Sequence, residues 1–188
     1  MTARWVADVA PQRDLKVTWK SISLYFKNEP APDSDYHDPV LYTHKLLRVL
    51  EAVRAAEGED KVFDLYWEYG RRIHHDKDRS FSAADALAAV GLDTSYADAF
   101  EAEKWDSVIR SAMDEGLALC GNDVGTPILG FDDENGRRVG YFGPVITRVP
   151  PGDGGLKLWD GLMTMASIDG FWEIKRTRTE RPEFGERP

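Results

Sequence analysis

Hydrophobic positions recur at helical spacing along much of the chain. Apolar residues share one face of residues 2–10, and residues 40–72 carry them three and four positions apart, with a break only at Gly58. This period is typical of helices with one buried side, so the longer stretch predicts two helices joined as a hairpin. Further helices are predicted at residues 82–90, from Thr94 or Ser95 onward, at residues 104–119 and at residues 156–171.

Three other stretches have the pattern of β-strands. From Leu15 to Leu24, polar residues alternate with β-branched and aromatic ones, which predicts one strand. Residues 128–131 and 138–142 predict two more, joined by a turn containing Asn135-Gly136, a strong hairpin signal. Residues 28–39 hold three prolines and several aspartates and are expected to form a loop.

The order of these elements is helix, strand, a block of helices, hairpin and helix, which predicts an α/β fold with a large helical insertion. More than one hundred residues separate the strand at 15–24 from the hairpin, and the opening helix has no strand before it. A parallel sheet needs a crossover between its strands. We therefore expect a sheet whose first strand is absent from this chain.

Composition narrows the class of protein. The chain has 188 residues, 42% of them hydrophobic and 30% charged, as expected for one globular domain or a domain with a subdomain. Its net charge of −9 argues against nucleic-acid binding, because phosphate recognition needs clustered Lys and Arg. The sequence shows no cleavable leader and no apolar run of membrane-spanning length, so we expect a cytoplasmic protein with no membrane partner.

The sequence offers few residues for nucleophilic or metal chemistry. Cys120 is the only cysteine, and it lies at the end of a predicted helix, where the helix dipole raises a thiol pKa. We therefore expect a small buried side chain rather than a nucleophile. His37, His44 and the pair His74-His75 lack a spacing that converges ligands, so no metal site is predicted.

A bend at residues 124–129 is the most informative local feature. Its Gly-Thr-Pro sequence predicts a constrained turn entering a buried strand, and residues 141–144 predict the exit of the next strand. Thioredoxin-like redox folds present their second catalytic element in this way. The usual partner is a Cys-x-x-Cys motif at the first helix, which this chain does not contain.

Seven blocks of the chain together resemble the actinobacterial DsbA-like family of mycothiol-dependent nitroreductases. They lie at residues 2–5, 23–29, 72–74, 123–127, 142–144, 157–160 and 175–179, and they are spaced as in that family nearly from end to end. The resemblance implies a thioredoxin-like fold with a large all-helical insertion. Residues 1–27 and 121–188 would form the core and residues 28–120 the insertion.

In that family, a strand and a Cys-Pro-Trp-Cys-type motif directly precede the residues matched by Met1 to Trp5. The resemblance therefore implies that Met1 is an internal methionine of a longer protein and that the nucleophilic cysteine lies upstream. We expect the chain as given to be inactive.

The resemblance also implies a set of site residues. Thr126-Pro127 is expected to be cis, so that a thiol substrate can pair with the backbone at Thr126. Asn28 matches a polar residue of the family's cleft and can hydrogen-bond a nitro or carbonyl oxygen, although Asn is also a common turn residue. Tyr36 follows in the same loop. His74 is a further candidate, although a histidine at a helix end can simply cap carbonyl groups.

The function implied is that of a thiol-disulfide oxidoreductase with mycothiol as reductant and a small electrophilic or nitro compound as acceptor. A homodimer is left open. Two alternatives remain: a non-catalytic thioredoxin-fold binding protein that begins at Met1, and a relative of the thiol-assisted isomerases or kappa-type transferases.

Overall fold

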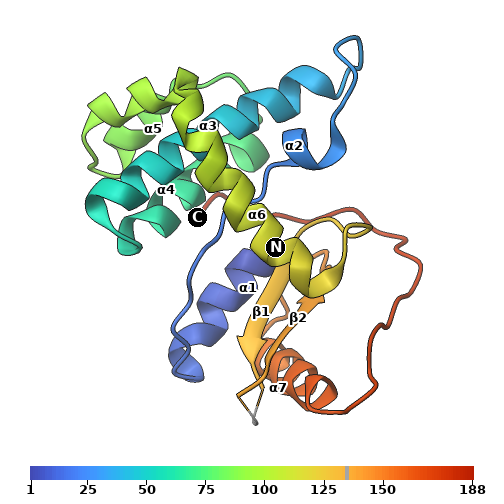
Figure 1. The fold of residues 1–188 in the computed structure, drawn as a ribbon. Coiled ribbons are helices and arrows are strands. Elements are labelled where there is room, and N and C mark those ends of the chain that lie inside the picture. The colour runs from blue at the N-terminus through green and yellow to red at the C-terminus, as the bar shows by residue number, and fades with distance from the viewer. Residues whose placement is uncertain (134–135) are drawn as a thin grey trace. The chain divides into compact units, whose positions relative to one another are not determined.

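The computed structural model describes residues 1–133 and 136–188 and contains mostly helices with one small sheet (Figure 1). The chain divides into two compact units. The hairpin unit comprises residues 1–17 and 116–185, and the helical unit comprises residues 18–115 and 186–188. The family resemblance implies corresponding boundaries at residues 28 and 120. The mostly helical content with a small sheet is compatible with the α/β class.

The helical unit contains a succession of helices that begins with a short one. Its elements are α2 (Leu24–Asn28), α3 (His37–Glu57), α4 (Asp60–Arg71), the π-helical turn η2 (Arg72–Asp76), α5 (Ala83–Ala89), the 3-10 helices η3 (Thr94–Glu101) and η4 (Glu103–Trp105), and most of α6 (Asp106–Cys120). The predicted pair of helices is confirmed. Gly58 caps α3 with a φ of 86°, a conformation that favours glycine.

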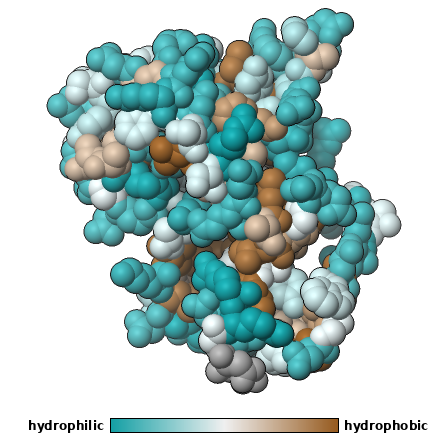
Figure 2. Space-filling model, viewed as in Figure 1, coloured by the Kyte–Doolittle hydropathy of each residue, from teal (hydrophilic) through white to brown (hydrophobic). Residues whose placement is uncertain are grey.

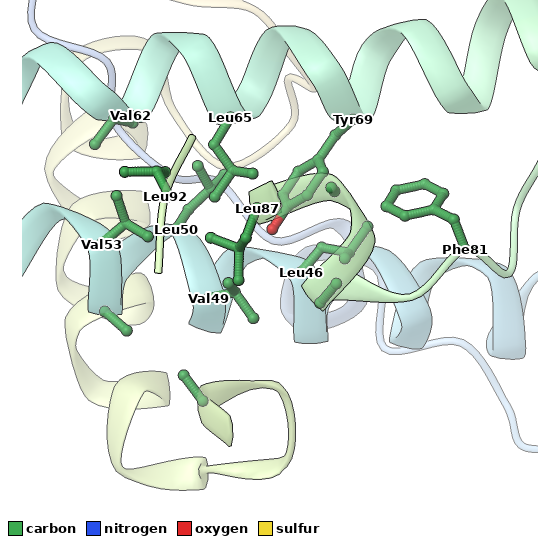
Figure 3. Close-up of a cluster of buried hydrophobic side chains, with 14 residues drawn as sticks. Leu46, Val49, Leu50, Val53, Val62, Leu65, Tyr69, Phe81, Leu87 and Leu92 are labelled. Atoms are coloured by element: carbon green, nitrogen blue, oxygen red, sulfur yellow. The ribbon is translucent and has the colours of Figure 1, made fainter. Parts of the chain in front are cut away.

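Three helices of this unit enclose an apolar core (Figure 3). Its side chains recur three and four residues apart on α3 and α4, as an amphipathic pair of helices requires. They include Leu46, Val49, Leu50 and Val53 on α3, Val62, Leu65 and Tyr69 on α4, and Leu87 on α5. Each large aliphatic side chain buried here contributes about 1.5–3 kcal/mol of hydrophobic stabilisation.

The hairpin unit contains α1 (Thr2–Val9), the short 3-10 helix η1 (Ala10–Gln12), strands β1 (Ile128–Asp132) and β2 (Arg138–Phe142), and α7 (Gly154–Ala166). The strands pair antiparallel from Ile128↔Phe142 to Asp132↔Arg138, which confirms the predicted hairpin. The predicted Asn135-Gly136 turn includes Asn135, which lies outside the described residues. The last helix ends at Ala166 rather than near residue 171.

Two close contacts hold the hairpin unit together. Gly130 and Gly140 face each other across the strands, and a Cβ atom at either position would lie within 3 Å of the Leu119 side chain. The end of α6 therefore lies closer to the sheet than it could if Gly130 or Gly140 were replaced by a residue with a side chain. Trp5 of α1 is fully buried and donates its indole N–H to the Gly155 carbonyl of α7 at 2.8 Å.

The strand predicted from Leu15 to Leu24 is wrong. Residues 15–23 have no strand pairing, and α2 begins at Leu24. The physical reason is that side chains occupy the backbone groups that a strand would use. The Trp19 N–H donates to Glu59 Oε1 at 2.9 Å, and the Trp19 carbonyl accepts a hydrogen bond from Arg54. Alternating hydrophobicity did not distinguish this extended segment from a strand.

Hydrophilic side chains cover most of the face drawn in Figure 2, as expected for a chain of which 30% is charged. None of the helices in the described ranges is long and apolar enough to cross a membrane.

Candidate functional site

The open end of the hairpin carries two cis proline bonds, Thr126-Pro127 and Gly143-Pro144. The first precedes β1 and the second follows β2. The Gly143 N–H donates to the Pro127 carbonyl at 2.8 Å, which extends the strand pairing by one step. The two prolines therefore lie on neighbouring segments of the chain at the same end of the sheet.

The first turn of α1 is attached to this end of the hairpin. Thr2 is buried, and its hydroxyl donates to the Pro144 carbonyl at 2.7 Å. Two hydrogen bonds thus lead from the first turn of α1, through Gly143 and Pro144, to Pro127. The first N–H groups of a helix have no partners within the helix and favour negative charge, so this arrangement suits an anionic or thiolate group nearby.

Thr126 is exposed at this end, and Pro127 is half-buried. Within the described residues, neither the N–H nor the carbonyl of Thr126 forms a backbone hydrogen bond. A peptide-like or thiol ligand with one donor and one acceptor can pair with such a residue as an added strand does.

Asn28 and Tyr36 lie at the two ends of the loop between α2 and α3 in the helical unit. Asn28 is the last residue of α2 and is exposed, and Glu29 after it takes the left-handed conformation with a φ of 42°. Tyr36 is 45% exposed and directly precedes α3. The loop is therefore shorter than predicted, because its first and last parts are helical.

His74 lies in the π-helical turn that follows α4, and its side chain is exposed. Turns of this kind are rare and occur often at functional sites. The turn ends at Lys77, which has a φ of 56°. Among residues 1–133 and 136–188, no three His, Cys, Asp or Glu side chains gather as metal ligands would.

Cys120 is half-buried at the C-terminal end of α6. Burial raises the pKa of its thiol, so the thiolate is scarce at neutral pH. This environment is the opposite of the one that activates a nucleophilic cysteine.

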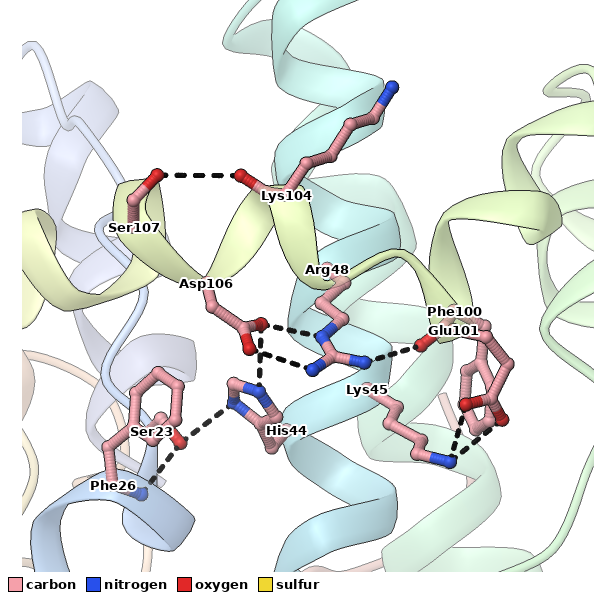
Figure 4. A network of polar contacts seen from close by, with 10 residues as sticks. All are labelled: Ser23, Phe26, His44, Lys45, Arg48, Phe100, Glu101, Lys104, Asp106 and Ser107. Carbon is pink, nitrogen blue, oxygen red and sulfur yellow. Dashed lines mark hydrogen bonds and ion pairs between the residues drawn. The ribbon is translucent and has the colours of Figure 1, made fainter.

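A buried polar network in the helical unit was not predicted (Figure 4). The Ser23 hydroxyl lies 3.0 Å from His44 Nδ1, and His44 Nε2 lies 3.1 Å from Asp106 Oδ1. Arg48 binds the same carboxylate with two hydrogen bonds of 2.6 and 2.8 Å. The sequence suggested only a metal-binding role for His44, and its spacing from the other histidines did not support that role. A histidine and an arginine on the apolar side of one helix were the available signal.

This network contains the residue types of a Ser-His-Asp triad, but it cannot act as one. Ser23 and His44 are 0% and 1% exposed, so no substrate reaches them. The Ser23 hydroxyl also accepts the Phe26 N–H at 3.2 Å and caps α2. The network is therefore part of the framework of the helical unit.

A family model described as Rv2466c-like, mycothiol-dependent nitroreductase Rv2466c, matches residues 1–176, which is nearly the whole chain. This match confirms the resemblance drawn from the seven sequence blocks. The chain belongs to the Rv2466c-like family of mycothiol-dependent nitroreductases.

Proposed function

We propose that the chain has a thioredoxin-like fold and takes part in thiol-disulfide oxidoreduction, in which it binds mycothiol as the reductant and a small nitro or other electrophilic compound as the acceptor. The match of residues 1–176 to the family carries this proposal. The hairpin end supports it, because two hydrogen bonds connect the first turn of α1 through Gly143 and Pro144 to Pro127, which directly follows the exposed Thr126. We assign the protein to the cytoplasm, where small thiols are kept reduced.

Mycothiol alone can supply the electrons and protons of the overall reaction. Two mycothiol thiols form one disulfide and release two electrons and two protons. A nitro group accepts these two electrons and two protons to give a nitroso group and water. Thiolate formation is the step that the protein must favour, and the N-terminal end of a helix stabilises a thiolate.

The site residues take separate roles in this proposal. The Thr126 backbone pairs with the thiol substrate, and Pro127 fixes the bend that presents it. The Asn28 amide donates a hydrogen bond to the acceptor oxygens. Tyr36 and His74 are further polar contacts of the acceptor. Cys120 takes no part, because burial raises its pKa.

Titration of isotope-labelled protein with mycothiol and, separately, with 4-nitrobenzyl alcohol tests these roles. We expect mycothiol to shift the amide resonance of Thr126 and the nitro compound to shift that of Asn28. Pro127→Ala should weaken mycothiol binding, whereas the control Cys120→Ala should leave it unchanged. Perturbation of neither residue by these two compounds would contradict the proposal.

A further inference from the structure

The buried network of Ser23, His44, Asp106 and Arg48 has one consistent arrangement of protons. Burial opposes ionisation of Asp106, but the hydrogen bonds and charge of Arg48, with His44, outweigh it and lower the pKa of Asp106. The carboxylate can then only accept, so His44 Nε2 carries the hydrogen. Burial lowers the pKa of His44, and the ring is neutral at pH 7. Its Nδ1 therefore accepts a hydrogen bond from the Ser23 hydroxyl.

This arrangement leaves the Ser23 oxygen free to accept the Phe26 N–H, and that hydrogen bond caps α2. The hydrogen bonds thus run from Arg48 through Asp106, His44 and Ser23 to the backbone of α2 (Figure 4). Every polar atom along this path has a partner. A fully connected network of this kind fixes one geometry, because no member can turn without losing a buried hydrogen bond.

The helix α2 depends on this support. It has five residues, fewer than a helix needs to be stable alone. Side chains of α3 and α6 pack against α2. The centroid of the Phe26 ring lies 4.4 Å from the centroid of the His44 ring on α3 and 4.0 Å from Cζ of Arg110 on α6. The position of α2 is therefore set by α3 and α6.

Asn28 is the last residue of α2, five positions after the Ser23 cap. We propose that Ser23, His44, Asp106 and Arg48 are positioning residues for Asn28, and that their network fixes the angle at which its amide meets the acceptor. This inference rests on the proposed function, since it assigns Asn28 to acceptor binding. It predicts that damage to the network weakens acceptor binding and leaves mycothiol binding intact.

Binding measurements on four variants test the inference, with 4-nitrobenzyl alcohol and mycothiol as the two ligands. Ser23→Ala removes the cap and should raise the Kd for the nitro compound roughly tenfold, the effect of one lost hydrogen bond, without a comparable change for mycothiol. Ser23→Thr keeps a hydroxyl and should restore the wild-type value. Asn28→Ala should match Ser23→Ala, and the double variant should be no worse than Asn28→Ala alone. Effects that multiply in the double variant would overturn the inference.

A stability control separates positioning from folding. Val62→Ala removes buried methyl groups from α4 and does not touch α2. We expect it to lower thermal stability while the Kd values for both compounds stay unchanged. A Ser23→Ala protein that behaves like Val62→Ala would show that the network is only structural.

Nuclear magnetic resonance relaxation keeps the inference testable if the proposed function fails. If the wild type binds neither compound, the proposed function is wrong, but the mobility of α2 can still be measured. We expect the backbone order parameter of Asn28 to fall in Ser23→Ala from a rigid value of about 0.85 toward about 0.6. An unchanged order parameter would overturn the inference independently of activity.

Discussion

In the helical unit, apolar side chains of α3, α4 and α5 bury one another, whereas the hairpin unit is held by a few anchoring contacts. Most of the large hydrophobic side chains that stay exposed in the described part of the chain belong to the hairpin unit. They are Phe142, Val145, Ile168, Trp172 and Ile174. Regions with fewer buried apolar contacts open at a lower free energy. We therefore expect the hairpin unit to open before the helical unit.

The helical unit and the hairpin unit perform different tasks. The helical unit combines an apolar core with a buried polar network, and both restrict the position of α2 and Asn28. The hairpin unit presents the Thr126 backbone at an end held by single hydrogen bonds. Segments that bind small ligands are commonly drawn from the less stable part of a fold. Substitutions should therefore affect stability most in one unit and thiol binding most in the other.

The largest expected effect is at the centre of the helical unit. Leu65 of α4 is fully buried in the core of the helical unit, so Leu65→Ala leaves a cavity and should lower the free energy of unfolding by about 3 kcal/mol. Hydrogen exchange measures the free energy of opening at each amide and shows which unit opens. The matched variant Leu162→Ala in α7 should speed exchange in the hairpin unit alone. Equal effects of both variants on both units would remove the contrast between them.

An intermediate effect is expected where α6 meets the sheet. A Cβ at Gly140 would lie 2.6 Å from Leu119 Cβ, so Gly140→Ala forces the strand or the helix to move. Overpacking of this kind costs about 1–3 kcal/mol. In Gly161→Ala on α7, the new methyl group meets no atom within 4 Å, and stability should hold or rise. Thermal unfolding compares the two. A neutral Gly140→Ala would show that this contact does not hold the hairpin unit together.

Local sequence patterns predicted the elements whose stabilising contacts are themselves local. The helix pair broken at Gly58 follows from spacing within each helix, and the hairpin follows from two short runs around a turn. The strand predicted at residues 15–24 was wrong because alternating polar and apolar residues fit any extended segment with one buried side. Its backbone partners Arg54 and Glu59 lie more than thirty residues away. A local pattern cannot contain that information.

The same reason explains what was missed at the site. His44 lies 21 residues from Ser23 and 62 from Asp106 in the sequence. Nothing in the spacing shows that these three residues meet. Thr126 and Pro127 were proposed from a contiguous bend together with the family resemblance, and Asn28, Tyr36 and His74 came only from the resemblance.

The smallest expected effect is the pH dependence contributed by one proton at His44. Burial lowers the pKa of this imidazole below its ordinary 6.5; the charge and hydrogen bond of Asp106 oppose the shift, and Arg48 and Arg110 add to it. As the pH falls through 6.5, the unfolded chain takes up a proton here that the folded chain does not. The contribution to stability is therefore complete above 6.5 and is lost as the pH falls toward the folded-state pKa.

Urea unfolding at about pH 7.5 and about pH 5.5 measures this loss across the range in which a free imidazole titrates. His44→Gln keeps an N–H that can reach Asp106 but has no proton to gain in this range. We expect the free energy of unfolding to depend less on pH in this variant than in the wild type. Asp106 does not contribute to the pH dependence in this range, because its pKa is lowered from 3.8 and it therefore titrates at more acidic pH. Identical pH profiles for the two proteins would show that His44 is not held neutral by its buried network, and would remove the proton arrangement on which the positioning of α2 depends.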